Sequence, residues 1–111
     1  MAIHSGVSDI IAVLITCPNR QTGEEIGRTV VEERLAACVN IIPGITSYYR
    51  WEGKLCRDRE ALLLVKTRKL KYMLLARRIK SLHPYSVPEI LALPVARGYS
   101  KYLTWVREST T

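Results

Sequence analysis

Hydrophobic residues fall into runs whose spacing separates strands from helices. Residues 9–16, DIIAVLIT, are almost continuously apolar and β-branched, which is typical of a strand buried on both faces. From Thr22 to about Ala37 the apolar positions recur at helical spacing. Thr22 and Glu25 fit a capping box, so we expect this helix to begin at Thr22.

A long hairpin is predicted over residues 38–66. Its first strand is broken at Pro43-Gly44, where a bulge belongs because proline cannot donate to a ladder. Glu52-Gly53 fits a two-residue turn. A hairpin this long overhangs so small a domain, and large rings near its tip are expected to be buried against a partner chain. These rings belong to Tyr48, Tyr49 and Trp51.

Thr67 is expected to cap a second helix over residues 68–83, which Pro84 ends because a residue before proline disfavours helical geometry. The spacing places basic residues on one face and apolar residues on the other. The expected apolar face holds Tyr72, Leu75, Ile79 and Leu82, widened by Leu70, Met73 and Leu74. A short strand over residues 89–95 and a helix from Ser100 follow.

The resulting order, βαββαβ plus a C-terminal helix, predicts an α+β fold of the split-βαβ or ferredoxin-like kind. Two helices would cover one face of a four-stranded antiparallel sheet, and other subunits would cover the other face. We expect a flexible N-terminal tail over residues 1–8 and a single domain over residues 9–111.

Charge is concentrated in one part of the chain. The net charge is +7, and the segment 66–80 holds seven cations and no acid, which accounts for the whole excess. Such a segment can attract nucleic acid, anionic lipid or an acidic small molecule, or can simply be a solvated helix face. Its role stays open at this point.

The cysteines and the N-terminal region bear on location. Cys17, Cys38 and Cys56 form no CxxC pair, which argues against a disulfide framework or zinc knuckle and favours reduced thiols. The apolar run 10–15 is too short for a membrane span and poor as a signal peptide. We therefore expect a cytoplasmic protein with no membrane partner.

Two stretches, RLAACVNIIPGITSYYRWEGK (residues 34–54) and HPYSVPEILALPV (residues 83–95), resemble the CutA family, and the resemblance spans residues 10–108. It implies a ferredoxin-like subunit in a tight homotrimer whose long strands pair between subunits, similar to the trimeric PII signalling proteins. It also implies a role in tolerance of or response to divalent metal ions, copper among them, through weak metal binding or signalling contacts.

Two residues are candidate metal ligands, because imidazole and thiolate bind copper and zinc well. His83 matches the histidine of the family's HPY motif. Some members carry a copper thiolate at the position that Ile15 occupies here, and Cys17 lies two residues after it. Strand residues two apart face the same side. The alternative for His83 is a helix-terminal role, bonding the last carbonyls. Cu(II) or another divalent ion is the expected ligand, and no cofactor is required.

A second candidate site is a small-ligand cleft between subunits, walled by Tyr49 and Trp51. Its polar groups would be Glu60, Lys66, Tyr85 and Glu89, although these residues also suit structural salt bridges and caps. The alternative function is accordingly a PII-like trimer that binds a small ligand or a protein and has no physiological metal site.

Two function classes are disfavoured. A ferredoxin-like RNA-binding domain stacks bases on aromatic residues of its sheet, whereas the third strand here reads EALLLVKT and the chain has no Phe. We therefore expect no nucleic acid partner. No GxSxG, Walker A, HExxH or Rossmann glycine pattern is present, so we expect no enzyme activity.

Overall fold

The computed structural model describes residues 8–111. The predicted tail, residues 1–8, lies outside the described residues except for Ser8, whose amide and hydroxyl both bond the Val95 carbonyl. The elements are β1 (Ile10–Cys17), α1 (Arg20–Glu32), β2 (Cys38–Trp51), β3 (Lys54–Arg68), the 3₁₀ turn η1 (Lys69–Lys71), α2 (Tyr72–Leu82), β4 (Ile90–Pro94) and α3 (Ser100–Ser109).

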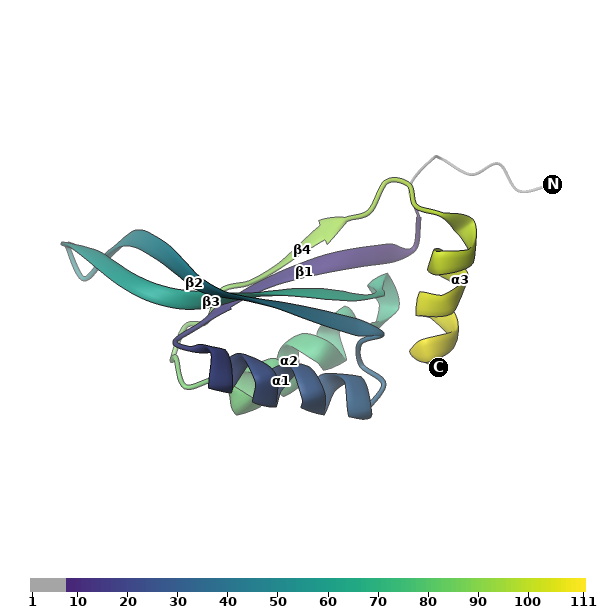
Figure 1. Ribbon diagram of the computed structural model, residues 1–111, viewed down its shortest axis with the longest axis horizontal. Helices are drawn as coiled ribbons and strands as arrows, with labels where there is room; N and C mark the ends of the chain where they lie inside the picture. The colour runs from purple at the N-terminus through teal and green to yellow at the C-terminus, as the bar shows by residue number, and fades with distance from the viewer. Residues whose placement is uncertain (1–7) are drawn as a thin grey trace.

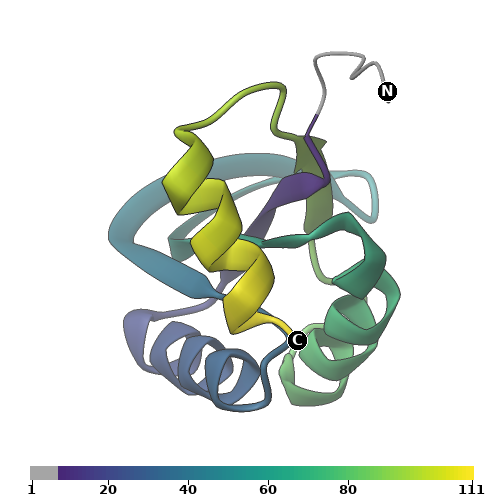
Figure 2. The ribbon, with the colours of Figure 1, turned by 90° about the vertical axis from the view of Figure 1, so that its right-hand side faces the viewer.

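The four strands form one antiparallel sheet in the order β2-β3-β1-β4. Helices α1 and α2 lie side by side under one face, and the other face has no helix over it (Figures 1 and 2). The predicted α+β fold, with βαββαβ order and a further C-terminal helix, is confirmed. Alternate residues of β1 and β3 point toward the helices and are fully buried, as the pleat of a strand requires. They include Val13, Ile15, Leu63 and Val65, which join Ile26, Val30, Leu75 and Ile79 of the helices in the core.

Helix α3 packs across one end of the sheet (Figure 2). Val106 is buried there with Ile10 and Ala37, in a small second cluster of apolar side chains. Arg107 forms an ion pair with Asp9 at 2.8 Å, close to the start of β1. No helix of the described chain is long and apolar enough to cross a membrane.

The β2–β3 hairpin extends far beyond the helices as an arm (Figure 1), and the molecule measures 54 × 28 × 22 Å. The bulge predicted at Pro43-Gly44 is confirmed, because the β2–β3 register shifts between Ile42 and Ile45 and Gly44 has φ +72°. The predicted turn is also confirmed: Glu52 and Gly53 both have positive φ, as a two-residue hairpin turn of type I′ requires.

Two predicted helix caps are wrong. Helix α1 begins at Arg20, because the Asn19 side chain accepts a hydrogen bond from the Thr22 amide at 2.8 Å. Strand β3 continues through Arg68, and Thr67 is a buried strand residue whose hydroxyl donates to the Leu35 carbonyl at 2.7 Å. Thr67 thus ties β3 to the chain after α1 and caps no helix.

The predicted width of the α2 core face is also wrong. Leu75 and Ile79 are fully buried, but Leu70, Met73 and Leu74 are 69%, 67% and 51% exposed. These three apolar side chains lie on the outer side of the helix, among its basic residues. The core therefore uses only the narrow stripe that faces the sheet.

The sheet face without helices is apolar. Residues paired across strands share a face, so Leu14 of β1 lies between Leu64 of β3 and Leu91 of β4. By the same pairing this face carries Ile42 and Leu93, both exposed.

Candidate functional site

A cleft of about 660 Å³ lies where the arm leaves the body of the domain. The end of β1, the arm part of β2, the middle of β3 and the loop after α2 each contribute to it. Its lining consists of Thr16, Thr46, Ser47, Tyr48, Tyr49, Trp51, Glu60, Tyr85, Ser86, Val87 and Glu89. Among the described residues, no lysine or arginine lines it, so its formal charge comes from two carboxylates.

The buried Glu60 and the half-buried Tyr85 form the centre of this lining. Glu60 on β3 is only 8% exposed, and the Tyr85 hydroxyl donates to its Oε2 at 2.8 Å. Burial, then the carboxylate itself, raises the pKa of Tyr85 well above the usual phenol value. Tyr85 therefore stays protonated and keeps donating to Glu60 at any physiological pH.

His83 positions this pair. Its ring is 7% exposed, its Nδ1 accepts from the Tyr85 amide at 3.1 Å, and its Nε2 lies 2.8 Å from the Thr16 carbonyl. The carbonyl is an acceptor and the amide a donor, so the neutral ring carries its proton on Nε2. Both ring nitrogens are thus engaged, and the side chain ties the loop after α2 to the end of β1. The backbone amide of His83, in turn, bonds the Ile79 carbonyl at the end of α2.

Cys17 lies on the opposite side of β1 from the cleft. Its side chain is fully buried beneath α1, and its Sγ points to the carbonyls of Asn19 and Ala61 at 3.6 and 3.8 Å. Burial, followed by the nearby charge of Glu60, raises the pKa of the Cys17 thiol to about 11. Over residues 8–111 no three His, Cys, Asp or Glu side chains form a group that could hold a metal ion. A metal role for His83 or Cys17 stays a prediction.

The cleft gathers three of the four predicted ligand residues: Glu60, Tyr85 and Glu89. Lys66 lies six residues further along β3, about 20 Å at the strand rise. There its ammonium group bonds the Asn40 side chain of β2.

The three predicted interface rings of the arm also wall the cleft, and all three are exposed. The Tyr49 hydroxyl donates to Asp58, which raises the pKa of Tyr49 to about 12. The Tyr48 hydroxyl accepts from Arg57 Nε at 3.1 Å, and Trp51 lies next to the turn. The hydroxyl residues of the cleft are not predictable from the sequence, because isolated Ser and Thr residues carry no spacing signal. They are Thr16, Thr46, Ser47 and Ser86.

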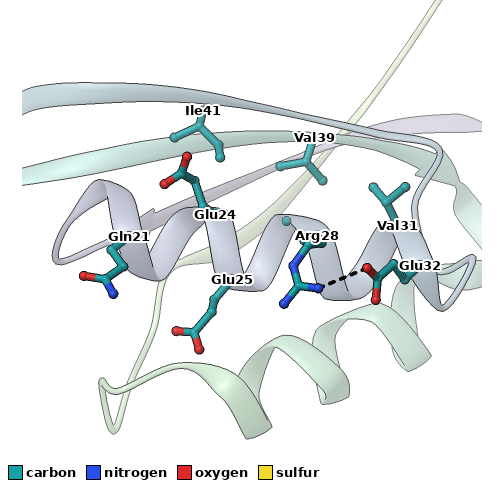
Figure 3. Close-up of a pocket in the computed structure, with 9 residues that line it drawn as sticks. Gln21, Glu24, Glu25, Arg28, Val31, Glu32, Val39 and Ile41 are labelled. Carbon is teal, nitrogen blue, oxygen red and sulfur yellow. Dashed lines mark hydrogen bonds and ion pairs between the residues drawn. The ribbon is translucent and has the colours of Figure 1, made fainter.

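A second, more open groove of about 600 Å³ runs between α1 and β2 (Figure 3). Val31, Val39 and Ile41 give it an apolar floor. Its rim holds Glu24 and Glu25, with the exposed pair Arg28–Glu32 at 3.2 Å. The sequence predicts these charges only as the solvent face of a helix, and the groove adds no cluster of buried polar groups to that description.

Comparison with known proteins identifies the family. The model of the CutA1 divalent ion tolerance protein family matches residues 11–109. The Divalent-cation tolerance protein CutA of Thermus thermophilus is 56% identical over 98 residues, which cover 88% of this chain and 95% of that protein. Human Protein CutA is 50% identical over 101 residues, 91% of this chain but only 56% of the longer human protein.

Solved structures agree. The divalent cation tolerance protein (Cut A1) of Thermus thermophilus superposes with a TM-score of 0.90 at 54% identity, covering 92% of this chain and 99% of that one. CutA1 from Oryza sativa gives 0.91 at 45% identity, covering 96% and 98%. The chain belongs to the CutA1 divalent ion tolerance protein family.

Proposed function

We propose that this protein acts in divalent-cation tolerance as a homotrimer that binds a divalent ion weakly in the cleft at the foot of the arm. The observation that supports this role is the composition of the cleft. Carboxylates, hydroxyls and aromatic rings surround it, and no cation within residues 8–111 lines it. Such a lining attracts positive charge.

The donor set fits some metals better than others. Glu60 and Glu89 offer carboxylate oxygens, which suit Mg²⁺, Ca²⁺ and Mn²⁺ better than copper, whose preferred ligands are nitrogen and sulfur. Two protein carboxylates are too few for a dedicated site, so water would complete the coordination shell. Within residues 8–111, His83 is the one imidazole near the cleft, and a copper ion would have to displace one of its two hydrogen bonds.

The homotrimer is supported by surfaces that a single chain leaves exposed. Ile42, Leu91 and Leu93 lie on the sheet face without helices, and exposed apolar patches of this kind mark protein contacts. The strands at both sheet edges, β2 and β4, offer unpaired backbone groups to a neighbouring chain. A neighbouring subunit over these surfaces would also close the cleft.

We propose binding, not catalysis, because neither Tyr85 in the cleft nor Cys17 on the other side of β1 is an activated nucleophile. Tyr85 is held protonated, and the raised pKa of Cys17 keeps it a thiol, whereas nucleophiles need a lowered pKa or an adjacent base.

The three free thiols accord with the reducing cytoplasm as the working compartment.

Titration with Mn²⁺, followed by electron paramagnetic resonance of the free ion, tests the proposal. The Glu89→Gln variant should bind Mn²⁺ at least tenfold more weakly than the wild type. Glu108→Gln, which removes an exposed carboxylate from α3, is the matched control and should leave affinity unchanged. Equal affinities for all three proteins would overturn the site.

A small organic cation is a second candidate for the same cleft. Its volume of about 660 Å³ lies within the range of small-molecule sites, and three aromatic rings line it. Rings attract organic cations through their π faces. Native mass spectrometry of the purified assembly should then detect a co-purifying compound that is absent from Tyr49→Ala.

A further inference from the structure

The outer face of α2 combines exposed apolar side chains with unpaired positive charge. Leu70, Met73 and Leu74 are spaced at i, i+3 and i+4 and are the exposed apolar residues described above. Residues at this spacing share one side of a helix, opposite the buried Leu75 and Ile79. We call the surface formed by these three residues and the cations around them the α2 outer face.

The cations of this face surround the apolar residues. Lys69 and Lys71 flank Leu70 in η1, and Arg77 continues the apolar spacing at i+7 from Leu70, with Lys80 one turn later. None of these four forms an ion pair within residues 8–111. The nearby pair is Arg78 with Glu33 of α1, at 2.9 Å, which leaves the four outer cations uncompensated.

We propose that the α2 outer face docks peripherally on an anionic lipid bilayer. Interfacial helices have this arrangement, with apolar side chains entering the headgroup region and basic side chains meeting anionic lipids. The bilayer explains both halves of the surface, because a purely electrostatic partner would leave Leu70, Met73 and Leu74 without a role. The proposal departs from the expectation of no membrane partner, which rested on the lack of a spanning segment.

The charge of the α2 outer face and the side chains that form it favour a bilayer over two other possible partners, a second copy of the chain and a nucleic acid. A second copy would bring the same positive charges against these ones, which disfavours self-association through this face. Single-stranded nucleic acid is bound by cations together with exposed aromatic rings. The aromatic residue of α2, Tyr72, lies on the side that packs against the core.

Co-sedimentation with vesicles of phosphatidylcholine alone, or mixed with phosphatidylserine in equal parts, tests the proposal. The wild type should bind the mixed vesicles, bind those of phosphatidylcholine alone at least tenfold more weakly, and lose affinity as salt rises. The double variant Lys69→Gln/Lys71→Gln should bind about 25-fold more weakly, about fivefold for each charge. Lys54→Gln/Lys101→Gln removes two exposed lysines elsewhere and should bind as the wild type.

A second pair of variants tests insertion. Leu70→Ser/Met73→Ser should weaken binding to mixed vesicles about tenfold or more, because apolar side chains no longer enter the bilayer. Leu55→Ser, which alters an equally exposed leucine of the arm, should have no effect. Unchanged binding by the Leu70/Met73 variant would overturn the proposal. So would a wild type that binds labelled RNA but neither kind of vesicle.

Discussion

Tyr85, in the loop between α2 and β4, donates its hydroxyl to Glu60 of β3 at 2.8 Å, beside a cleft that the arm helps to form. Replacing Tyr85 by Phe leaves the buried carboxylate without this donor. We expect Tyr85→Phe to lower the free energy of unfolding by about 1–3 kcal/mol, the cost of an unsatisfied buried group.

Urea denaturation measures this loss. Tyr99→Phe removes a hydroxyl from an exposed ring and should leave the free energy of unfolding unchanged. If the two variants are equally stable, the Tyr85–Glu60 hydrogen bond contributes nothing to the free energy of unfolding.

His83 has a positioning role that can be separated from metal binding. His83→Ala removes the two hydrogen bonds that join Thr16 to the loop, and should cost about 2 kcal/mol of unfolding free energy, about 1 kcal/mol for each bond. Any hyperfine coupling of added Cu(II) to imidazole nitrogen should be the same in the paramagnetic resonance spectra of the wild type and His83→Ala. Nitrogen coupling that disappears in His83→Ala, with stability unchanged, would instead make His83 a copper ligand.

Trp51 is the ring nearest the turn of the arm and half of its surface is exposed in the single chain. If the arm packs on a neighbouring subunit, Trp51→Ala should weaken the homotrimer by about 2 kcal/mol or more, as for other central interface rings. Light scattering on serial dilution measures the mass of the assembly. Tyr99→Ala, off the arm, is the control, and a Trp51 variant that keeps its mass at every dilution contradicts the prediction.

Ionisation of the Cys17 thiol should lower the free energy of unfolding in alkaline solution. Burial raises the pKa of its thiol from 9.0 to about 11, so the unfolded chain loses this proton at lower pH than the folded one. The contribution of the protonated thiol to the free energy of unfolding is complete below pH 9 and is lost as the pH rises through about 11. In Cys17→Ala the slope of unfolding free energy against pH over this interval should be smaller than in the wild type. At neutral pH a thiol-alkylating reagent should modify Cys56 well before Cys17.

Thr67 bonds the Leu35 carbonyl from within β3. Thr67→Val keeps the shape of this fully buried side chain but removes its hydroxyl, and should cost about 1–3 kcal/mol because the carbonyl loses its partner. Thr104→Val, on the exposed side of α3, should change thermal stability little. A helix cap at Thr67 would instead have predicted lower helicity with the core intact, which circular dichroism distinguishes.

The local chemistry of the chain predicts the arm well. Pro43-Gly44 and Glu52-Gly53 impose a bulge and a turn through backbone restrictions that need no distant partner. The βαββαβ order also follows from periodicity alone, because long apolar runs and helical stripes differ in length and spacing.

The predictions that were wrong depend on how residues far apart in the chain are placed in the fold. Thr67 looks like a cap until its partner, 32 residues earlier in the chain, is known. Lys66 joined the predicted ligand set because Glu60 and Lys66 are the polar residues at the two ends of the apolar segment ALLLV, but β3 is extended between them and so keeps the two side chains about 20 Å apart. Leu70 and Met73 satisfy a core periodicity, but the single sheet can cover only one side of α2.

The two strands of the arm differ in continuity. Strand β3 runs through Lys54–Arg68 without a break, from the tip of the arm to the helix layer, whereas β2 is interrupted at Pro43-Gly44. Glu60 pairs with Ile45, the first paired residue of β2 after the register shift, so the carboxylate of the cleft lies level with the bulge. The bulge therefore fixes where Glu60 stands relative to the arm residues of β2, and removing it would shift the pairing of the whole arm by the residues that the bulge absorbs.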